Sequence, residues 1–176
     1  GTQIFQMGPL DQGWWPDGLY TAPSDEALLF DIKAMKELGF NMIRKHIKVE
    51  PSRWYMHCDR EGILVWQDLP SPNLPEGHEA FARQNFEEEA VRIIDAFENH
   101  PSIVQWVVFN EGWGQFDTER MTQVVIDKVS PQSLVCCASG WNDTEIGDIK
   151  DSHSYPYSSC PIDQKRACVN GEYGGI

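Results

Sequence analysis

Hydrophobic residues follow two different periods along this chain. From Leu28 onward, apolar side chains recur every three or four positions, as on one face of a helix, and Ser24 ahead of them is a favourable N-cap. By contrast, residues 103–110 are almost wholly apolar, which is typical of a strand buried on both faces of a parallel sheet. The alternation of these two patterns predicts repeated strand–helix units.

The same patterns place the individual elements. Strands are expected at Ile4–Gly8, Phe40–His46, Ile63–Asp68, Ile103–Asn110, Leu134–Ser139, Asp148–Tyr155 and Cys168–Tyr173. The expected helices are one after Ser24 that buries Leu28, Ile32, Met35 and Leu38 and stops at Gly39, one at Ser52–Arg60, one that buries Phe86, Ala90, Ile93, Ile94 and Phe97 before Pro101, and one capped by Asp117 with Met121, Val124 and Val125 inward. The segment 9–23, rich in Gly, Pro and Trp, is expected to be a loop.

Seven strands interleaved with helices fit either an open doubly wound sheet or a barrel. The positions of polar residues favour the barrel, because they fall at the carboxyl ends of successive strands: Arg44 and His46, Asp68, Asn110 and Glu111, Trp141, His153 and Tyr155, and Glu172. In a barrel these ends converge on one mouth. We therefore predict an α/β fold, a (β/α)8 TIM barrel formed by residues 1–176 as one domain, truncated before its eighth strand.

Composition narrows the class of partner. The net charge of -13 argues against nucleic acid, which is bound through clustered Lys and Arg, and no run of apolar residues is long enough to span a membrane. The first residues lack the pattern of a signal peptide, and the compartment stays open. Five cysteines without CxxC or zinc-ligand spacing are interpreted as free thiols: Cys58, Cys136, Cys137, Cys160 and Cys168.

Two glutamates are the strongest candidates for chemistry. Glu111 and Glu172 each end a run of apolar or small residues, and each is followed by glycine and aromatic residues. Cleavage of a glycosidic bond needs two carboxyl groups, held about 5–5.5 Å apart in a retaining enzyme. We expect these two carboxyl groups on the same side of the barrel, within about 6 Å of each other. Asn110 is expected to orient the sugar 2-hydroxyl group.

Several motifs along the chain resemble glycoside hydrolase family two, the group that contains β-galactosidases, β-glucuronidases and β-mannosidases. They are NMIRKH at 41–46, RWY at 53–55, CDREGILVWQD at 58–68, HPSIV at 100–104 leading into NE at 110–111, HSYP at 153–156 and GEY at 171–173. The resemblance implies that Glu111 is the acid/base and Glu172 the nucleophile. It also implies that Arg44 steadies the nucleophile and that Tyr155 donates a hydrogen bond to the same carboxylate.

Further residues are expected to line a sugar pocket from their places at strand ends or in the first loop: Asp11, His46, Asp68, Trp141 and His153, with Trp14 and Trp15 as a wall. Some β-galactosidases of the family bind magnesium through a Glu and a His after strand three. Residues 66–70 do not reproduce that pair, so we predict no metal and no cofactor.

The expected activity is removal of a terminal β-linked sugar from a carbohydrate substrate. Two alternatives remain open at this stage: an endo-acting glycanase of related fold, and a non-catalytic carbohydrate-binding or inactive fragment. The eighth strand and the β-sandwich domains usual in the family are missing from the 176 residues, so the chain is expected to be a piece of a larger protein. The preferred sugar and the oligomeric state do not follow from the sequence.

Overall fold

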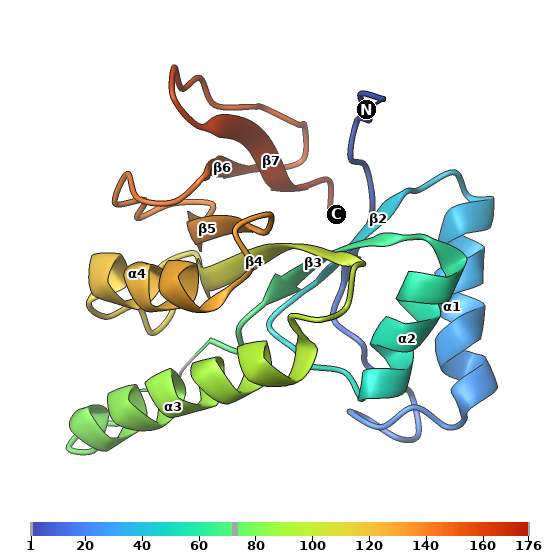
Figure 1. The fold of residues 1–176 in the computed structure, drawn as a ribbon, viewed down its shortest axis with the longest axis horizontal. Helices are drawn as coiled ribbons and strands as arrows, with labels where there is room; N and C mark the ends of the chain where they lie inside the picture. The colour runs from blue at the N-terminus through green and yellow to red at the C-terminus, as the bar shows by residue number, and fades with distance from the viewer. Residues whose placement is uncertain (1, 72–73, 176) are drawn as a thin grey trace.

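The first five strands form one parallel sheet (Figure 1). The computed structural model describes residues 2–71 and 74–175 of the chain. Each strand of the sheet pairs with the next in sequence: β1 (Leu10–Asp11), β2 (Met42–Lys45), β3 (Leu64–Asp68), β4 (Ile103–Asn110) and β5 (Leu134–Ser139). Their carboxyl ends consequently lie along one edge of the sheet.

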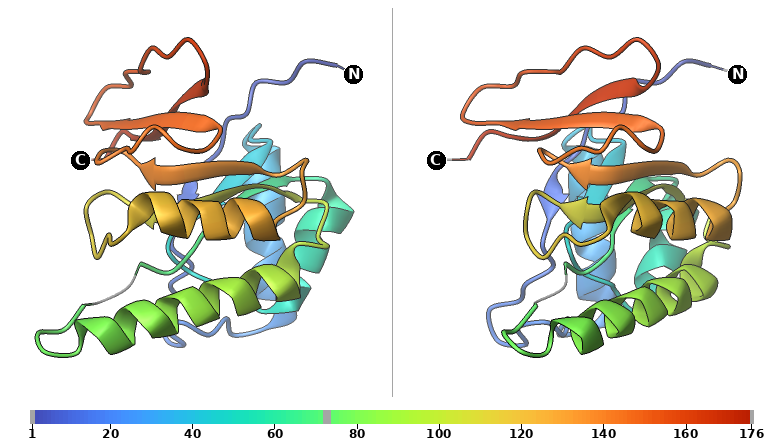
Figure 2. Two further views of the ribbon diagram at one scale, coloured as in Figure 1. Left: turned by 60° about the vertical axis from the view of Figure 1, so that its left-hand side comes forward. Right: turned by 90° about the vertical axis from the view of Figure 1, so that its left-hand side faces the viewer.

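Two more parallel strands continue this arrangement. β6 (Ile149–Ser154) and β7 (Ala167–Tyr173) form their own ladder, and β6 lies beside β5 (Figure 2). The link to β5 includes a hydrogen bond of 2.8 Å from the Asp148 amide to the Val135 carbonyl. All seven strands therefore follow one another in space in chain order, as in part of a TIM barrel, and the predicted fold class is confirmed.

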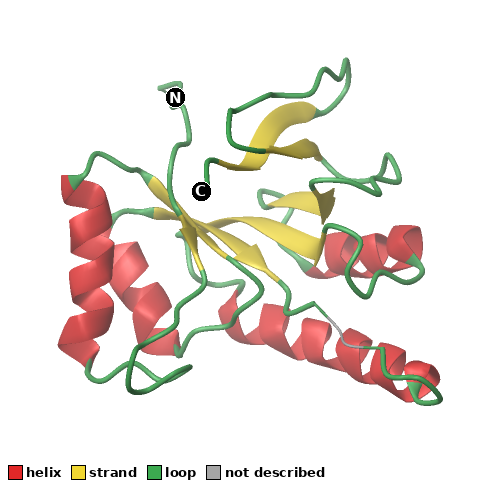
Figure 3. Cartoon of the chain, turned by 180° about the vertical axis from the view of Figure 1, so that it is seen from behind, coloured by secondary structure: helices red, strands yellow, loops and turns green. Residues whose placement is uncertain are grey.

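Four helices of the described chain cover the outer side of the five-stranded sheet (Figure 3). They are α1 (Asp25–Glu37), α2 (Ser52–Glu61), α3 (Glu79–Phe97) and α4 (Thr118–Lys128). Residues 140–148 and 155–166, which precede β6 and β7, form loops without a helix. None of the helices in the described residues is both long and apolar enough to cross a membrane.

Alternation along the strands separates a packing face from a polar face. Ile43 and Val65 lie in the main hydrophobic core together with helix residues such as Ile32 and Ile94. Arg44, the next residue after Ile43, points to the other face, where its guanidinium contacts residues from β3, β4 and β7. The strands thus use one face for stability and the other for a buried polar cluster.

Most predicted elements are confirmed, and the β4 and β5 bounds agree residue for residue. The predicted first strand is wrong. The regular strand is Leu10–Asp11, inside the segment predicted to be a loop, while part of the predicted strand is held through Asn41, whose amide donates to the Phe5 carbonyl and whose oxygen accepts from the Met7 amide. Hydrophobicity alone placed the strand too early, because, among the described residues, the main-chain bonds from β2 and the residue before it reach this segment only at Met7 and Pro9.

Two details of the predicted helices are also corrected. Leu38 is the C-cap of α1 and is 75% exposed, because the chain turns at Gly39 with a φ of +92° before another helical turn can bury it. Asp117 occupies the N-cap position of α4 but makes no capping hydrogen bond through its side chain. Ser24 caps α1 as predicted, accepting from the Ala27 amide, and all five cysteines are free.

Candidate active site

Glu172, near the end of β7, is held by donors from two other strands. Arg44 of β2 donates from Nη1 to Glu172 Oε1 over 3.2 Å. The Tyr155 hydroxyl, just after β6, donates to Glu172 Oε2. Burial and the neighbouring carboxylate raise the pKa of Tyr155, so its hydroxyl stays a neutral donor. Arg44 and Tyr155 together fix both oxygens of the Glu172 carboxylate.

Arg44 is itself fixed by a buried carboxylate. Its Nε and Nη2 atoms donate to the two oxygens of Asp68 at 3.1 and 2.9 Å, and Nη2 also donates to Asn110 Oδ1 at 2.9 Å. Burial opposes the charge of Arg44, but Asp68, Asp151 and Glu172 outweigh it and raise its pKa above the usual range. Asp68 is 1% exposed, and Ile47 N is a further donor to it, so Asp68 supports Arg44 from behind and does not line an open pocket.

Glu111 follows β4 in a backbone conformation that is uncommon for a residue with a side chain. Its φ of +55° lies in the left-handed region, and its amide donates to the Ser139 carbonyl at 2.8 Å. The carboxylate accepts a 2.7 Å hydrogen bond from Trp113 Nε1 at Oε2. At Oε1 it meets His153 Nδ1 at 3.0 Å. The turn after β4 therefore directs Glu111 toward β6 and β7.

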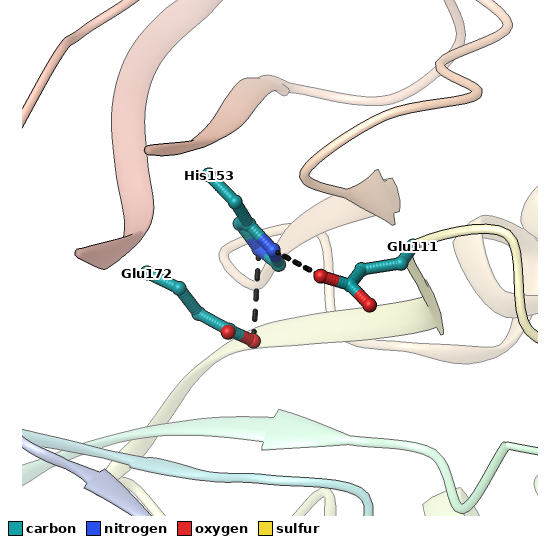
Figure 4. Close-up of side chains that lie close together, drawn as sticks. All are labelled: Glu111, His153 and Glu172. Atoms are coloured by element: carbon teal, nitrogen blue, oxygen red, sulfur yellow. Dashed lines mark hydrogen bonds and ion pairs between the residues drawn. The ribbon is translucent and has the colours of Figure 1, made fainter. Parts of the chain in front are cut away.

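His153 lies between the two glutamates (Figure 4). Its side chain is fully buried, with Nδ1 at 3.0 Å from Glu111 Oε1 and Nε2 at 3.7 Å from Glu172 Oε1. Nε2 also lies 2.8 Å from Ser139 Oγ. One oxygen of Glu111 and one of Glu172 are within 4.8 Å of each other. The two carboxylates thus face a common space at the carboxyl ends of the strands.

Three other predicted residues surround this pair. His46 Nε2 is 3.4 Å from Glu172 Oε1, and burial lowers the pKa of His46. The Trp141 ring packs edge-on against His153 with centroids 5.5 Å apart, and this tryptophan is 48% exposed. Asn110 is buried beside Arg44. The structure therefore brings Arg44, His46, Asn110, Glu111, Trp141, His153, Tyr155 and Glu172 into one cluster.

Asp11 does not join the cluster. It pairs in register with Lys45 and shares that residue's side of the sheet, where the Lys45 ammonium lies 2.6 Å from Asp11 Oδ2 and 2.9 Å from Glu50 Oε1. Because neighbouring strand residues point to opposite faces, Lys45 lies on the reverse side from Arg44. The expectation that Asp11 faces the sugar is thus corrected, since register was needed to assign its face.

The two loop tryptophans have different surroundings. Trp14 is 60% exposed and packs edge-on against Tyr20, whereas Trp15 packs against the main hydrophobic core. The expectation that both tryptophans form a sugar wall is therefore wrong for Trp15, which has a core to enter. A pocket wall formed by Trp14 stays a prediction.

Some residues of the cluster were not predicted. Trp113 was noted only as an aromatic residue after Glu111, and its direct hydrogen bond to that carboxylate depends on the turn geometry. Ser139 and Asp151 lie inside strands, on the face shared with His153. The sequence offers little signal for Asp151, because β6 reads IKDSHS and only Ile149 and Asp151 of this strand are buried.

Glu111, His153 and Glu172 are close enough together to be considered as metal ligands. The donor set suits a resident ion poorly. His153 turns a different nitrogen toward each carboxylate, and Arg44 already occupies the Glu172 oxygen that is nearest the imidazole. Magnesium also prefers oxygen ligands. These contacts therefore do not fit a resident metal ion.

The parallel strands, the outer helices and the polar mouth define a TIM-barrel domain. Residues 22–170 match the family model described as glycosyl hydrolases family 2, TIM barrel domain, and the chain belongs to this family. The match includes Glu111 and ends two residues before Glu172.

Curated relatives are glycosidases much longer than this chain. A β-glucuronidase of Bacteroides fragilis is 32% identical over 88 residues, which cover 46% of this chain and 12% of the relative. A β-galactosidase of Lactococcus lactis is 33% identical over 98 residues, covering 52% of this chain and 10% of the relative. The matched stretch, about half of this chain, thus covers about a tenth of the length of these relatives.

Among solved structures, the chain resembles β-glucuronidase 2 of Bacteroides uniformis, covalently bound to cyclophellitol-6-carboxylate aziridine. The TM-score is 0.72 at 22% identity, and the match covers 87% of this chain and 21% of the other. At this identity the likeness establishes the fold.

Proposed function

We propose that this chain carries the catalytic residues of a retaining glycoside hydrolase that releases a terminal β-linked sugar by double displacement. The observation that supports this most strongly is the approach of Glu111 and Glu172, with carboxylate oxygens within 4.8 Å. Retaining enzymes hold their carboxyl groups about 5–5.5 Å apart, whereas inverting enzymes leave about 6.5–9.5 Å for a water molecule. The spacing therefore favours direct attack by one carboxylate.

The surroundings of the two carboxylates favour different roles. Arg44 and Tyr155 donate to Glu172, which suits a carboxylate that is ionised when the substrate arrives. Glu111 has no guanidinium among its hydrogen-bond partners in the described chain and contacts Trp113 and His153 instead. We assign Glu172 as nucleophile and Glu111 as general acid/base.

The reaction then follows two steps. Glu172 attacks the anomeric carbon while Glu111 gives its proton to the departing oxygen, so the glycosidic bond breaks as a glycosyl–Glu172 ester forms. In the second step Glu111 takes a proton from water, and the resulting attack releases the sugar with its original configuration. The proton lost by Glu111 in the first step is regained in the second.

Neighbouring groups are suited to hold the sugar between the carboxylates. In this proposal Asn110 orients the 2-hydroxyl group. His46 lies beside Glu172, and Trp141 lies beside His153. Trp141 is half exposed and offers an apolar ring to a sugar face. The covalent adduct of the Bacteroides uniformis enzyme adds support, because a related barrel is trapped in the covalent manner that double displacement requires.

We further propose that residues 1–176 act as one catalytic domain within a longer polypeptide that also has β-sandwich domains. The curated relatives are much longer than the stretch they share with this chain. The substrate is a carbohydrate, with no role for nucleic acid or a membrane. The names of these relatives point to β-glucuronides and β-galactosides as the first substrates to test for the whole protein.

The test uses the longest natural polypeptide that contains these residues, screened with aryl β-galactoside, β-glucuronide, β-mannoside and α-arabinoside. Proton NMR of the first product from the best substrate reports its anomeric configuration before mutarotation. We expect that a β-glycoside substrate first yields the β-anomer.

First release of the α-anomer from a β-glycoside would overturn the retaining mechanism. Cleavage of internal bonds only, in a polymeric substrate, would favour the endo-acting alternative. A folded full-length protein that binds sugars but cleaves none of them would favour a non-catalytic role.

A further inference from the structure

Asp151 is a buried carboxylate that the proposed reaction does not use. It lies in β6, is 4% exposed, and accepts two short hydrogen bonds. The Ser139 hydroxyl donates to Oδ2 at 2.5 Å, and the Gly171 amide donates to Oδ1 at 2.6 Å. Gly171 immediately precedes Glu172. Asp151 therefore contacts the strand that carries the nucleophile as well as β5.

A chain of contacts leads from Asp151 to the other glutamate. Ser139 Oγ lies 2.8 Å from His153 Nε2, and His153 Nδ1 lies 3.0 Å from Glu111 Oε1. The imidazole is fully buried, so water does not compete for its nitrogens. Asp151, Ser139, His153 and Glu111 thus form a continuous chain, which we call the acid/base chain.

The direction of the hydrogen bonds in the acid/base chain follows from counting protons. Ionised Asp151 has none to give, so Ser139 donates its single hydroxyl proton to Asp151. The Ser139 oxygen must then accept from His153 Nε2–H. A neutral imidazole protonated at Nε2 leaves Nδ1 bare, and Nδ1 can bond to Glu111 only if Glu111 carries a proton.

We propose that Asp151 is a positioning residue which, through Ser139 and His153, orients the acid/base chain so that Glu111 is held in its acid form. The inference rests on the proposed function and deepens it, because it names the residues that keep the proton for the leaving group on Glu111. If the imidazole takes up that proton instead, the His153–Glu111 pair still holds it within one hydrogen bond of the reacting oxygen. Either way the pair carries one proton more than neutral His153 and ionised Glu111.

Charged and titratable groups from every neighbouring strand face this chain. Those next to it are Arg44 of β2, Cys136 of β5, Tyr155 after β6, and Glu172 of β7. Asp68 of β3 lies one contact further away, paired with Arg44. Burial raises the pKa of Asp151, while Arg44, the Ser139 hydroxyl, the Gly171 amide and His153 oppose that shift. Gly171 is required for this packing, since a Cβ there would lie 2.2 Å from Asp151 Oδ2.

Asp151→Asn tests the direction of the chain with little change in shape. The amide can still accept from Gly171 N, but its NH2 group donates to Ser139, which must then give its own proton to His153 Nε2. The imidazole is left protonated at Nδ1 and donates to Glu111, so the ionised form of Glu111 becomes the favoured partner. The substitution therefore reverses the chain without cutting it.

We expect a selective loss in this variant, measured in the full-length protein. For alkyl glycosides, whose leaving groups need protonation, kcat/KM should fall about 10²-fold, within the range attributed to general acid catalysis. For activated aryl glycosides kcat/KM should change little, and the alkaline limb of its pH profile with alkyl substrates should move to lower pH. Asp148→Asn is the matched control, because Asp148 accepts from the Val135 amide outside the acid/base chain.

Ser139→Ala gives a second, independent test, because it removes a single buried oxygen and cuts the chain. Ser139→Ala should show a smaller loss of kcat/KM with the same selectivity for alkyl glycosides. The double variant Ser139→Ala/Asp151→Asn should then have the same pH profile as Ser139→Ala. Equal losses for alkyl and aryl substrates, or an unshifted alkaline limb in both variants, would overturn the inference. If Asp151→Asn does not fold, the inference is tested with Ser139→Ala alone, by the same comparison of alkyl with aryl substrates and by the alkaline limb of its pH profile. Failure of the proposed function looks different: the unmutated protein would then cleave no glycoside, or Glu172→Gly would remain active.

Discussion

Arg44 and Glu172 are 128 positions apart in the sequence, yet Arg44 Nη1 donates to Glu172 Oε1 over 3.2 Å. The contact joins β2 to β7 across the mouth of the partial barrel. The same guanidinium binds Asp68 through two nitrogens, so the nucleophile candidate is oriented by a group that is itself held on two sides. This arrangement ties the position of Glu172 to the folding of the first half of the chain.

Replacement of Arg44 by methionine should therefore impair both stability and activity. Asp68 would be left buried without its cationic partner, and breaking such a buried pair costs about 3–5 kcal/mol. Urea unfolding measures the change in the free energy of unfolding. The double variant Arg44→Met/Asp68→Asn should recover part of the stability but not the activity, because Glu172 still lacks its cation. A loss below about 1 kcal/mol in the single variant would contradict this view of the pair.

Glu111→Ala should separate the two steps of the reaction. An activated aryl leaving group departs without protonation, so formation of the glycosyl–enzyme should survive while its hydrolysis slows by about 10²–10⁴. Added azide should restore turnover, and the product from a β-glycoside should be the β-glycosyl azide. Isolation of the α-azide from this variant would mean that the roles of Glu111 and Glu172 are reversed.

Residues at the ends of strands could be assigned to this site from the sequence, whereas residues whose role depends on which face of the sheet they occupy could not. Glu111 and Glu172 could be paired because the carboxyl ends of parallel strands converge, whatever the register. Asp11 could not be assigned to a face without register, and its true partner is Lys45. The buried role of Asp68 likewise depends on Arg44 turning inward. Alternation fixes relative faces along one strand, but only packing decides which face is the barrel interior.

The strands also differ in how well the sequence predicts their bounds. The β4 and β5 bounds were predictable because their apolar runs are nearly continuous and end in polar residues. The short β1 strand was not, because Asn41 binds the preceding segment through its side chain and local hydrophobicity does not report this. The acid/base chain could not be predicted for a related reason. Ser139 and Asp151 contact each other only because β5 and β6 lie side by side, and the sequence does not report this pairing.

Outside the site, the loops before β6 and β7 are tied together by an ion cluster with a defined pH dependence. Arg166 binds both oxygens of Asp143 at 2.8 Å, and Lys150 lies 2.6 Å from Oδ2. The Arg166 hydrogen bonds, assisted by Lys150, hold the pKa of Asp143 well below its usual range. Since an unfolded Asp has a pKa of about 3.9, this stabilisation is present above that pH and is lost as pH falls through the folded-state value.

Asp143→Asn should accordingly lower the free energy of unfolding at neutral pH. The difference in this free energy between the variant and the unmutated protein, the gap, should become smaller on acidification. Urea unfolding at a series of pH values between about 7 and 3 measures the gap. Asp127→Asn is a suitable control, because within residues 2–71 and 74–175 the Asp127 side chain contacts only the exposed Gln123 of the same helix. A gap that stays constant over this pH range would show that the cluster is not stabilised by the charge of Asp143.

Double displacement requires Glu172 to form a covalent bond to the sugar. The most direct measurement is inactivation of the full-length protein by a 2-deoxy-2-fluoro β-glycoside with an activated leaving group, followed by mass spectrometry of the peptides. We expect one fluorosugar per active site, carried by the peptide that contains Glu172 and absent from Glu172→Gly. A label on Glu111, or hydrolysis of natural substrate by Glu172→Gly at the unmutated rate, would contradict this claim.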